Sequence, residues 1–283
     1  MTNPRGKLQT AFRRYRAPLL NALLFNGWAA ALSYRCGLHG RLGVTRHRVT
    51  LPAARALPRP LRIAFASDFH AGPTTDPALF DALFDCLAQE RPDVLLLGGD
   101  FISGKAENLA ALSAGLARCE PPLGKFGVYG NHDLWADDEL MGRMLADAGV
   151  RMLVNRHVTL PAPFDAVSIC GLDDPWAGAP DAGAAFAGAA DVRVLLMHAP
   201  DGLLLLGGER FDLAFAGHTH GGQVAFRDGK PLILPQGPLG RSHYHGRYDT
   251  AGDGPLIVSR GIGCSTIPLR INADPELVIC TIE

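Results

Sequence analysis

Residues able to bind a metal ion follow several apolar runs of this 283-residue chain. The clearest case is FDLAFAGHTHGGQ at 211–223, where residues 211–216 predict a buried strand and His218 and His220 come just after it. Side chains two positions apart share a face if the backbone stays extended. Neutral imidazoles are the commonest metal ligands among side chains. This motif alone suggests a metal site at a strand end.

Four other apolar runs end on side chains of the same kinds. They are Asp68 and His70 after 61–67, Asp100 after 93–97, Asn131 and His132 after 124–129, and His198 after 191–197. A single Asp at such a position usually caps the next helix. Five successive cases indicate one shared site, because ligands of open α/β sheets bind beyond the carboxyl ends of the strands.

The kinds of donor atom narrow the choice of metal. Two carboxylates, four imidazoles and one amide oxygen suit Mn, Fe or Zn better than Ca. Seven ligands are too many for one tetrahedral zinc ion. They suit two ions about 3.5–4 Å apart that share a carboxylate, an arrangement used on phosphate esters.

Helical and strand patterns alternate in the first half of the chain. Helices are predicted over 76–89, 108–119 and 138–148, and further strands over 150–160, 166–170, 231–234, 256–259 and 277–281. Alternation followed by strand-rich sequence predicts an α/β layered domain with two sheets.

The ordered motifs resemble those of the calcineurin-like metallophosphoesterase superfamily. They are Asp68-x-His70, Gly99-Asp100, Gly130-Asn131-His132-Asp133, His198 and Gly217-His218-x-His220. GLDD at 171–174 and SRGIGCSTIPLR at 259–270 are most similar to the bacterial membrane-associated branch of small phosphodiesterases. The resemblance implies a four-layer α/β fold, in which a two-sheet β-sandwich is flanked by helices.

The resemblance also implies a role for each motif residue. Asp68, His70 and His220 hold one divalent ion, Asn131, His198 and His218 hold the other, Asp100 bridges them, His132 supports the leaving group, and Asp133 orients His132. The implied reaction is in-line attack on a phosphodiester by a hydroxide that bridges two ions. Mn is the metal we expect, with Fe and Zn as alternatives.

Substrate contacts are expected from two late segments. The candidates are Arg241, His243, Tyr244 and His245 in GRSHYHGRY, and Arg270. A solvated loop is the alternative for the first four residues, and a structural salt bridge is the alternative for Arg270.

The N-terminal region is basic. Residues 1–62 contain twelve Lys or Arg and no acidic residue, although the whole chain has a net charge of −1. Residues 17–34 are uncharged and lie between Arg16 and Arg35. A helix lying in a membrane interface explains both flanks. A spanning helix, a signal peptide cleaved near Ala31, and a helix docked on the body are the alternatives.

We therefore expect residues 1–48 to form a basic, apolar arm on an anionic membrane, and residues 49–283 to form the phosphoesterase domain. Positive charge favours the cytoplasmic face of the inner membrane, with export or a single N-terminal anchor as the alternative. No specific nucleic-acid partner is expected, because no nucleic-acid-reading motif accompanies the basic residues.

A compact phosphodiesterase with such an arm suggests a lipid-linked substrate such as UDP-diacylglucosamine. A soluble phosphodiesterase, acting on cyclic nucleotides or general diesters, is the first alternative. A metal-binding scaffold without catalysis is the second.

Overall fold

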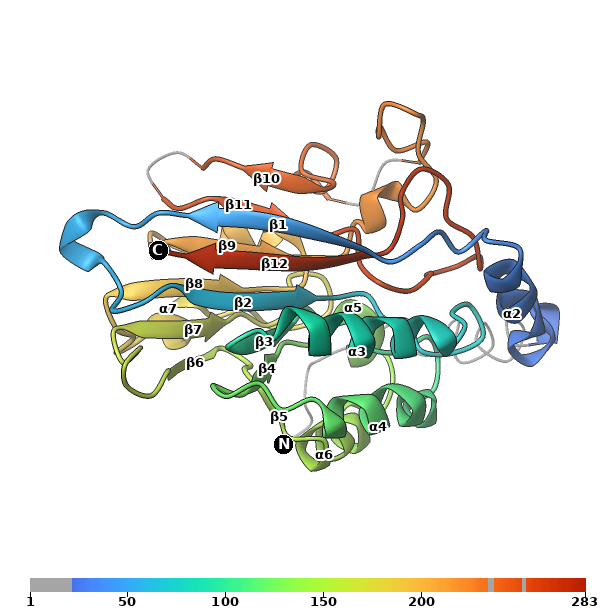
Figure 1. Ribbon diagram of the computed structural model, residues 1–283, viewed down its shortest axis with the longest axis horizontal. Helices are drawn as coiled ribbons and strands as arrows, with labels where there is room; N and C mark the ends of the chain where they lie inside the picture. The colour runs from blue at the N-terminus through green and yellow to red at the C-terminus, as the bar shows by residue number, and fades with distance from the viewer. Residues whose placement is uncertain (1–21, 234–236, 251–252) are drawn as a thin grey trace.

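Two six-stranded sheets face each other, and helices cover their outer sides (Figure 1). The computed structural model describes residues 22–233, 237–250 and 253–283. The strand orders are β1-β12-β2-β3-β4-β5 and β10-β11-β9-β8-β7-β6. The predicted α/β fold with a two-sheet sandwich is confirmed.

The first sheet consists of β1 (Gly43–Val49), β2 (Leu61–Ala66), β3 (Val94–Leu97), β4 (Lys125–Gly127), β5 (Val150–Met152) and β12 (Glu276–Ile282). The second consists of β6 (Arg156–Thr159), β7 (Val167–Gly171), β8 (Val192–Leu196), β9 (Leu213–Ala216), β10 (Gly246–Tyr248) and β11 (Leu256–Val258). Strands β2, β3 and β4 are parallel, as are β8 and β9.

The α-helices described are α2 (Trp28–Arg35), α3 (Ala78–Glu90), α4 (Ala110–Arg118), α5 (Asn131–Leu134), α6 (Asp138–Asp147) and α7 (Ala182–Phe186). Short 3-10 turns are η2 (Phe25–Gly27), η3 (Ala53–Arg55), η4 (Ala106–Leu109), η5 (Pro200–Leu205) and η6 (His220–Gly222).

Successive side chains of a strand point to opposite faces, so the first sheet has core residues on both sides. On β2, Ile63 and Phe65 pack between the sheets, whereas Ala64 and Ala66 join the cluster that includes residues of α3, α4 and α6. The rings of Phe65 and Phe215 lie 5.0 Å apart between the sheets. This packing holds the carboxyl ends of β2 and β9 close together.

The predicted strand over 150–160 is wrong as a single element. The chain forms β5 in the first sheet and then β6 in the second. Asn155 lies immediately before β6 with φ 50°, a left-handed conformation that interrupts an extended strand. An apolar pattern does not reveal such a crossing between sheets.

The sheet begins earlier in the chain than expected. Strand β1 runs parallel to β12 from Gly43 to Val49, so the expected boundary between residues 48 and 49 falls inside it. It is an edge strand with only one residue buried, and its basic side chains lack the apolar signature of a core strand.

Helix α2 is docked on the body through two small residues and through Tyr34, which packs against the core. Ala30 and Ser33 are buried, and the Ser33 hydroxyl donates to the carbonyl of Pro268. No helix within residues 22–233, 237–250 and 253–283 has the length and hydropathy needed to span a bilayer. Residues 1–21 of the expected arm lie outside the described residues.

The strand predicted over 231–234 ends at residue 234, which also lies outside the described residues. Pro231 makes a single β-bridge with Ala225.

Candidate metal centre

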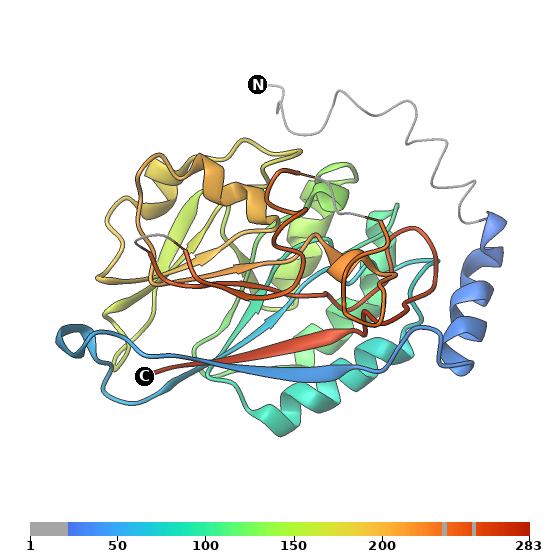
Figure 2. The same ribbon diagram turned by 90° about the horizontal axis from the view of Figure 1, so that it is seen from above.

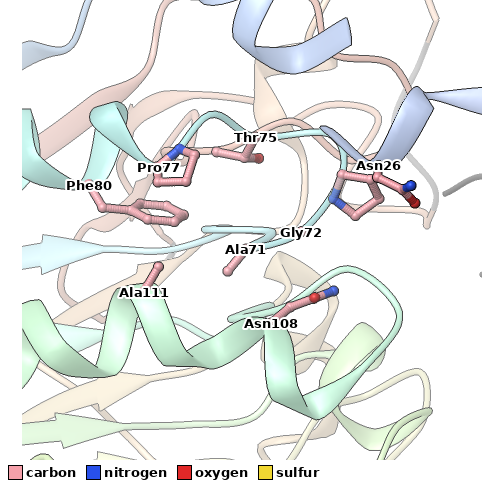
Figure 3. Close-up of a pocket in the computed structure, with 9 residues that line it drawn as sticks. Asn26, Ala71, Gly72, Thr75, Pro77, Phe80, Asn108 and Ala111 are labelled. Atoms are coloured by element: carbon pink, nitrogen blue, oxygen red, sulfur yellow. The ribbon is translucent and has the colours of Figure 1, made fainter. Parts of the chain in front are cut away.

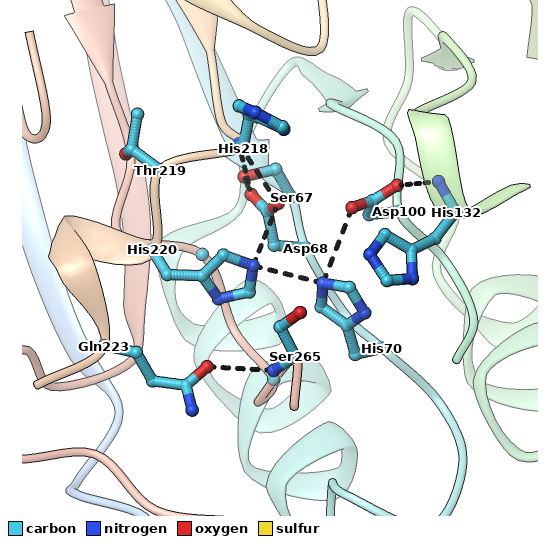
Figure 4. Close-up of polar contacts among 12 residues, drawn as sticks. Ser67, Asp68, His70, Asp100, His132, His218, Thr219, His220, Gln223 and Ser265 are labelled. Atoms are coloured by element: carbon cyan, nitrogen blue, oxygen red, sulfur yellow. Dashed lines mark hydrogen bonds and ion pairs between the residues drawn. The ribbon is translucent and has the colours of Figure 1, made fainter. Parts of the chain in front are cut away.

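All seven predicted ligands come together beyond the carboxyl ends of β2, β3, β4, β8 and β9. Figure 4 shows Asp68, His70, Asp100, His218 and His220 of this group. A first cluster contains Asp68, His70 and His220, all buried. The two imidazole Nε2 atoms are 3.1 Å apart, and Nε2 of His220 is 3.4 Å from Oδ1 of Asp68. The side chains that follow β2 and β9 thus place three possible ligand atoms close together.

A second cluster is formed by Asn131, His198 and His218. Nε2 of His198 lies 3.2 Å from Oδ1 of Asn131 and 3.2 Å from Nδ1 of His218. These side chains follow β4, β8 and β9. The two histidines of the His218-x-His220 motif therefore belong to different clusters.

Asp100 stands between the clusters. Its Oδ2 atom is 3.5 Å from Nε2 of His70 and 3.4 Å from Nε2 of His198. Its other oxygen, Oδ1, accepts the backbone N–H of His132 at 2.8 Å. One carboxylate oxygen is therefore positioned to serve both clusters.

The backbone at this site is strained. Five of the seven predicted ligands have positive φ, namely Asp68 (54°), His70 (44°), Asp100 (52°), His218 (71°) and His220 (53°). Each such conformation costs on the order of 1 kcal/mol for a residue with a side chain, and strain of this kind gathers at functional sites. The surrounding hydrogen bonds must offset that cost.

Glycines allow the loops to approach the two carboxylates. A Cβ on Gly217 would lie 2.3 Å from Oδ2 of Asp68, and a Cβ on Gly130 would lie 2.3 Å from Oδ1 of Asp100. Both distances are too short for a methyl group, so glycine is required at these positions.

Burial sets the charge state of the ligands. It lowers the pKa of His70 to about 3 and that of His218 to about 3, which keeps these imidazoles neutral. It raises the pKa of Asp68 to about 6. Burial opposes protonation of His198 as well, but the Asp100 and Asp68 carboxylates raise its pKa well above the usual range.

The residues present fit divalent cations. Imidazole nitrogens face one another at 3.1 Å in a buried pair and at 3.2 Å in a part-buried pair, with carboxylate oxygens at 3.4 and 3.5 Å. Buried charges and lone pairs gathered in this way are normally paired or coordinate a metal. The oxygen and nitrogen donors match Mn, Fe or Zn.

Partners on the other ring nitrogens orient two of the histidines. Nδ1 of His198 is 2.7 Å from the carbonyl of Gly98, and Nδ1 of His70 is 3.0 Å from the Ser103 hydroxyl. Such contacts leave Nε2 facing the centre, as in known metal sites. Ser103 belongs to none of the sequence motifs described above, so its role emerges only from the structure.

Arg270 supports His220 from inside the protein, which corrects its expected role as a substrate contact. Its guanidinium is buried and donates to the carbonyls of Gly263, Ala273 and Arg260. Nη2 also lies 3.3 Å from Nδ1 of His220. Arg270 is therefore held inside the protein, behind the imidazole of His220.

His132 lies at the rim of the centre. Its ring meets the edge of His70, with centroids 4.8 Å apart, and tilts against Trp135 at the same separation. Its ligand atom also falls within 4.8 Å of those of His70 and Asp100. The side chain is partly exposed, so it can reach a bound substrate.

The contacts given for the Asp133 side chain are to backbone amides. Oδ1 accepts the backbone N–H of Phe101 at 2.8 Å and of Ile102 at 3.4 Å, and Oδ2 accepts that of Gly130 at 2.9 Å. Asp133 therefore fastens the loop that carries Asp100 to the start of α5. Its expected role in orienting His132 stays a prediction.

Only part of the predicted substrate loop adjoins the centre. The carbonyl of Tyr244 accepts a hydrogen bond from the hydroxyl of Thr219 at 2.7 Å. Thr219 is the residue between the two motif histidines. His243 instead packs on Tyr248, with ring centroids 4.4 Å apart. Among the described contacts, Arg241, His243 and His245 make none with the seven predicted ligands.

The sequence reasoning missed Trp176. Its ring stacks on His218, with centroids 6.0 Å apart and an interplanar angle of 19°, and 44% of the residue is exposed. A lone tryptophan in a loop carries no distinctive sequence signal. Its position beside the second cluster makes it a candidate substrate contact.

A separate cavity of about 310 Å³ lies between α3, α4 and the segment after β2 (Figure 3). Ala71, Gly72, Pro77, Phe80 and Ala111 are among its lining residues. None of the seven predicted ligands lines it. Ala71, which lines it, directly follows His70.

The comparisons with known proteins agree with this geometry. The family model described as calcineurin-like phosphoesterase matches residues 61–222. Phosphodiesterase YaeI of Escherichia coli (strain K12) is 31% identical over 251 residues, which covers 85% of this chain and 88% of YaeI. The metallophosphoesterase YkuE of Bacillus subtilis (strain 168) is 32% identical, covering 69% of each chain. A metallophosphoesterase of Aquifex aeolicus (strain VF5) is 31% identical, covering 79% of this chain and 85% of that protein. The chain belongs to the calcineurin-like phosphoesterase family and is a hydrolase of phosphoric esters.

Proposed function

We propose that this enzyme is a phosphodiesterase with two divalent metal ions. The observation that carries the proposal is the position of Asp100, whose Oδ2 atom lies 3.5 Å from His70 and 3.4 Å from His198. Asp68, His70 and His220 would hold one ion, Asn131, His198 and His218 would hold the other, and Asp100 would be shared. We propose Mn as the metal, with Fe and Zn as the alternatives that the mixed nitrogen and oxygen donors also fit.

When bound, two such ions supply Lewis-acid polarisation of phosphate oxygens and make water acidic enough to act as a nucleophile near neutral pH. The protein's own contribution is placement and proton transfer. His132 donates a proton to the leaving oxygen from the rim of the site. Its position is fixed because its backbone N–H donates to Asp100. Asp133 in turn holds the loops of Asp100 and Asn131 in register.

We propose a lipid-linked phosphodiester such as UDP-diacylglucosamine as the substrate. The basic N-terminal sequence supports this, because it favours an anionic membrane at the cytoplasmic face. Trp176 supports a nucleotide portion, since an exposed ring beside the centre offers a face on which a base can stack.

The same tryptophan also fits a soluble nucleotide diester. A general or cyclic-nucleotide phosphodiesterase is therefore the second candidate function. The two candidates share the metal centre and differ in whether the substrate carries acyl chains.

One assay series tests these proposals. Chelator-treated enzyme is reconstituted with Mn, Fe or Zn and assayed on bis-p-nitrophenyl phosphate, a cyclic nucleotide and UDP-diacylglucosamine in mixed micelles. We expect turnover to require two bound ions per chain and to be fastest on the lipid. Turnover of the small diester without turnover of the lipid would contradict the proposal of a lipid-linked substrate. Metal-independent turnover would contradict the proposed centre.

A further inference from the structure

Exposed apolar side chains gather in three segments at one end of the molecule. Nine of the twelve large hydrophobic residues exposed among the described residues fall within 22–42, 223–233 and 265–275. They are Leu23, Trp28, Leu32, Leu38, Phe226, Leu232, Ile233, Ile267 and Ile271. Single exposed hydrophobics are normal, but a concentration of them marks an interaction surface. We call these three segments the apolar rim.

The three segments are joined although they are far apart in the sequence. The backbone N–H of Arg270 donates to the carbonyl of Leu38 at 2.8 Å, and that of Ala225 donates to the carbonyl of Ile271 at 2.9 Å. The Ser33 hydroxyl binds the carbonyl of Pro268. Both ribbon views place α2 and the two late loops at the same end of the molecule (Figures 1 and 2).

Helix α2 exposes large apolar side chains although it is docked on the body. It buries Ala30 and Ser33 and packs Tyr34 against the core, but it exposes Trp28 (62%) and Leu32 (47%). Trp28, Leu32 and Arg35 are four and three residues apart, so they share a face. A face that exposes Trp28 and Leu32 beside an arginine fits a membrane interface better than water.

The charges of the apolar rim favour an anionic partner. Its exposed basic residues are Arg35, Arg41, Arg227 and Lys230, and its exposed acidic residues are Asp228 and Asp274. Large apolar side chains accompanied by an excess of basic ones match the interface of a bilayer with anionic headgroups.

The apolar rim is fastened to the metal centre. The Gln223 side chain donates to the carbonyl of Ile267 and accepts the N–H of Ser265, each at 2.9 Å. Gln223 directly follows η6, which begins with His220. Arg270, from the same late loop, lies against the His220 imidazole. A membrane held by these loops would lie close to the site of hydrolysis.

We infer that the apolar rim is a membrane-docking surface for an anionic bilayer, built jointly by α2 and the two late loops. It presents the metal centre to an amphiphile whose phosphodiester lies at headgroup level. This inference deepens the proposed action on a lipid-linked substrate and rests on it. It differs from attachment by the N-terminal arm alone, because Phe226 and Ile271 take part directly.

Sedimentation with phosphatidylcholine vesicles, with and without phosphatidylglycerol, tests the inference on the full chain. Two double variants are compared with the wild type. One combines Phe226→Ser and Ile271→Ser, and the other combines Trp28→Ser and Leu32→Ser. Leu204→Ser is the matched control, since Leu204 is 59% exposed in η5, outside the apolar rim. Circular dichroism and thermal melting establish that each variant is folded.

We expect the wild-type chain and the control to bind the anionic vesicles, and each double variant to bind about tenfold more weakly because apolar burial is lost. Unchanged binding by the Phe226 and Ile271 variant would overturn the inference, as would a wild-type chain that binds neither kind of vesicle. Hydrolysis of bis-p-nitrophenyl phosphate by the wild-type chain without lipid tests the proposed chemistry separately, so the two failures are distinguishable.

Discussion

The backbone N–H of His218 donates to both carboxylate oxygens of Asp68, each 3.0 Å away. The two residues are 150 positions apart and follow β9 and β2, which belong to different sheets. The contact therefore ties together the two sides of the metal centre. It also contributes to holding both residues in their left-handed conformations.

Replacement of Asp68 by Asn should remove one ion and spare the fold. Asn keeps an oxygen that accepts from His218 but loses the charge that a cation needs. We expect metal content to fall from two ions per chain to one, and kcat/KM to fall by about a thousandfold. Plasma mass spectrometry and the diester assay measure both quantities.

Asp147→Asn, on the exposed end of α6, is the control for that substitution and should behave as the wild type. Full metal content in Asp68→Asn would show that Asp68 is not a ligand.

Replacement of His132 by Gln should leave both ions bound but lower kcat by roughly a hundredfold or more, because the leaving oxygen loses its proton donor. A substrate with a good leaving group, such as bis-p-nitrophenyl phosphate, should be affected less than an alkyl diester. The measurement is kcat on both diesters, together with metal content. Loss of a metal ion would instead identify His132 as a ligand, since its ring nitrogen also lies near His70 and Asp100.

Replacement of Asp133 by Ala should destabilise the protein and disturb the site. It leaves the N–H groups of Phe101 and Gly130 without their buried acceptor, at a cost of about 3 kcal/mol in the free energy of unfolding. Thermal melting and kcat should fall together. Asp133→Asn retains one acceptor oxygen and should be intermediate in both. Its pH profile should match the wild type, whereas a shifted profile would indicate that Asp133 takes part in proton transfer.

Asp174 should make stability depend on pH. It is fully buried, and burial raises its pKa to about 6. A carboxyl in the unfolded chain has a pKa of about 4, so the folded state binds more protons between these values. Its contribution to stability is thus present below pH of about 4 and is lost as pH rises through about 6.

Asp174→Asn lacks this titration. We expect the free energy of unfolding of the metal-free wild type, relative to the variant, to fall by up to about 3 kcal/mol between those pH values. Urea unfolding of both proteins across the range measures the difference. Parallel pH dependences would refute the assignment.

Replacement of Trp176 by Ala should weaken binding of nucleotide diesters and spare small ones. Loss of a stacked base costs roughly 1–3 kcal/mol, so KM for a nucleotide substrate should rise about tenfold or more. The KM for bis-p-nitrophenyl phosphate should hardly change. Equal effects on both substrates would mean that Trp176 supports His218 rather than a base.

The sequence by itself determined the strands and the chemistry at their ends. Apolar runs of four to seven residues located β2, β3, β8 and β9 closely, because these strands are buried on both faces. Polar residues directly after such strands are confined to one edge of a sheet, so the grouping of these residues was predictable. The edge strand β1 and the crossing at Asn155 were not predictable, since half-exposed strands and single turns leave little apolar signature.

Only the tertiary structure decided which contacts support the predicted ligands. Asp133 binds backbone amides, Arg270 lies buried behind His220, and Trp176 covers His218. These contacts join segments from different sheets, and side-chain direction at such junctions depends on loop dihedral angles and packing. Local sequence does not encode those quantities, because each depends on neighbours that are distant along the chain.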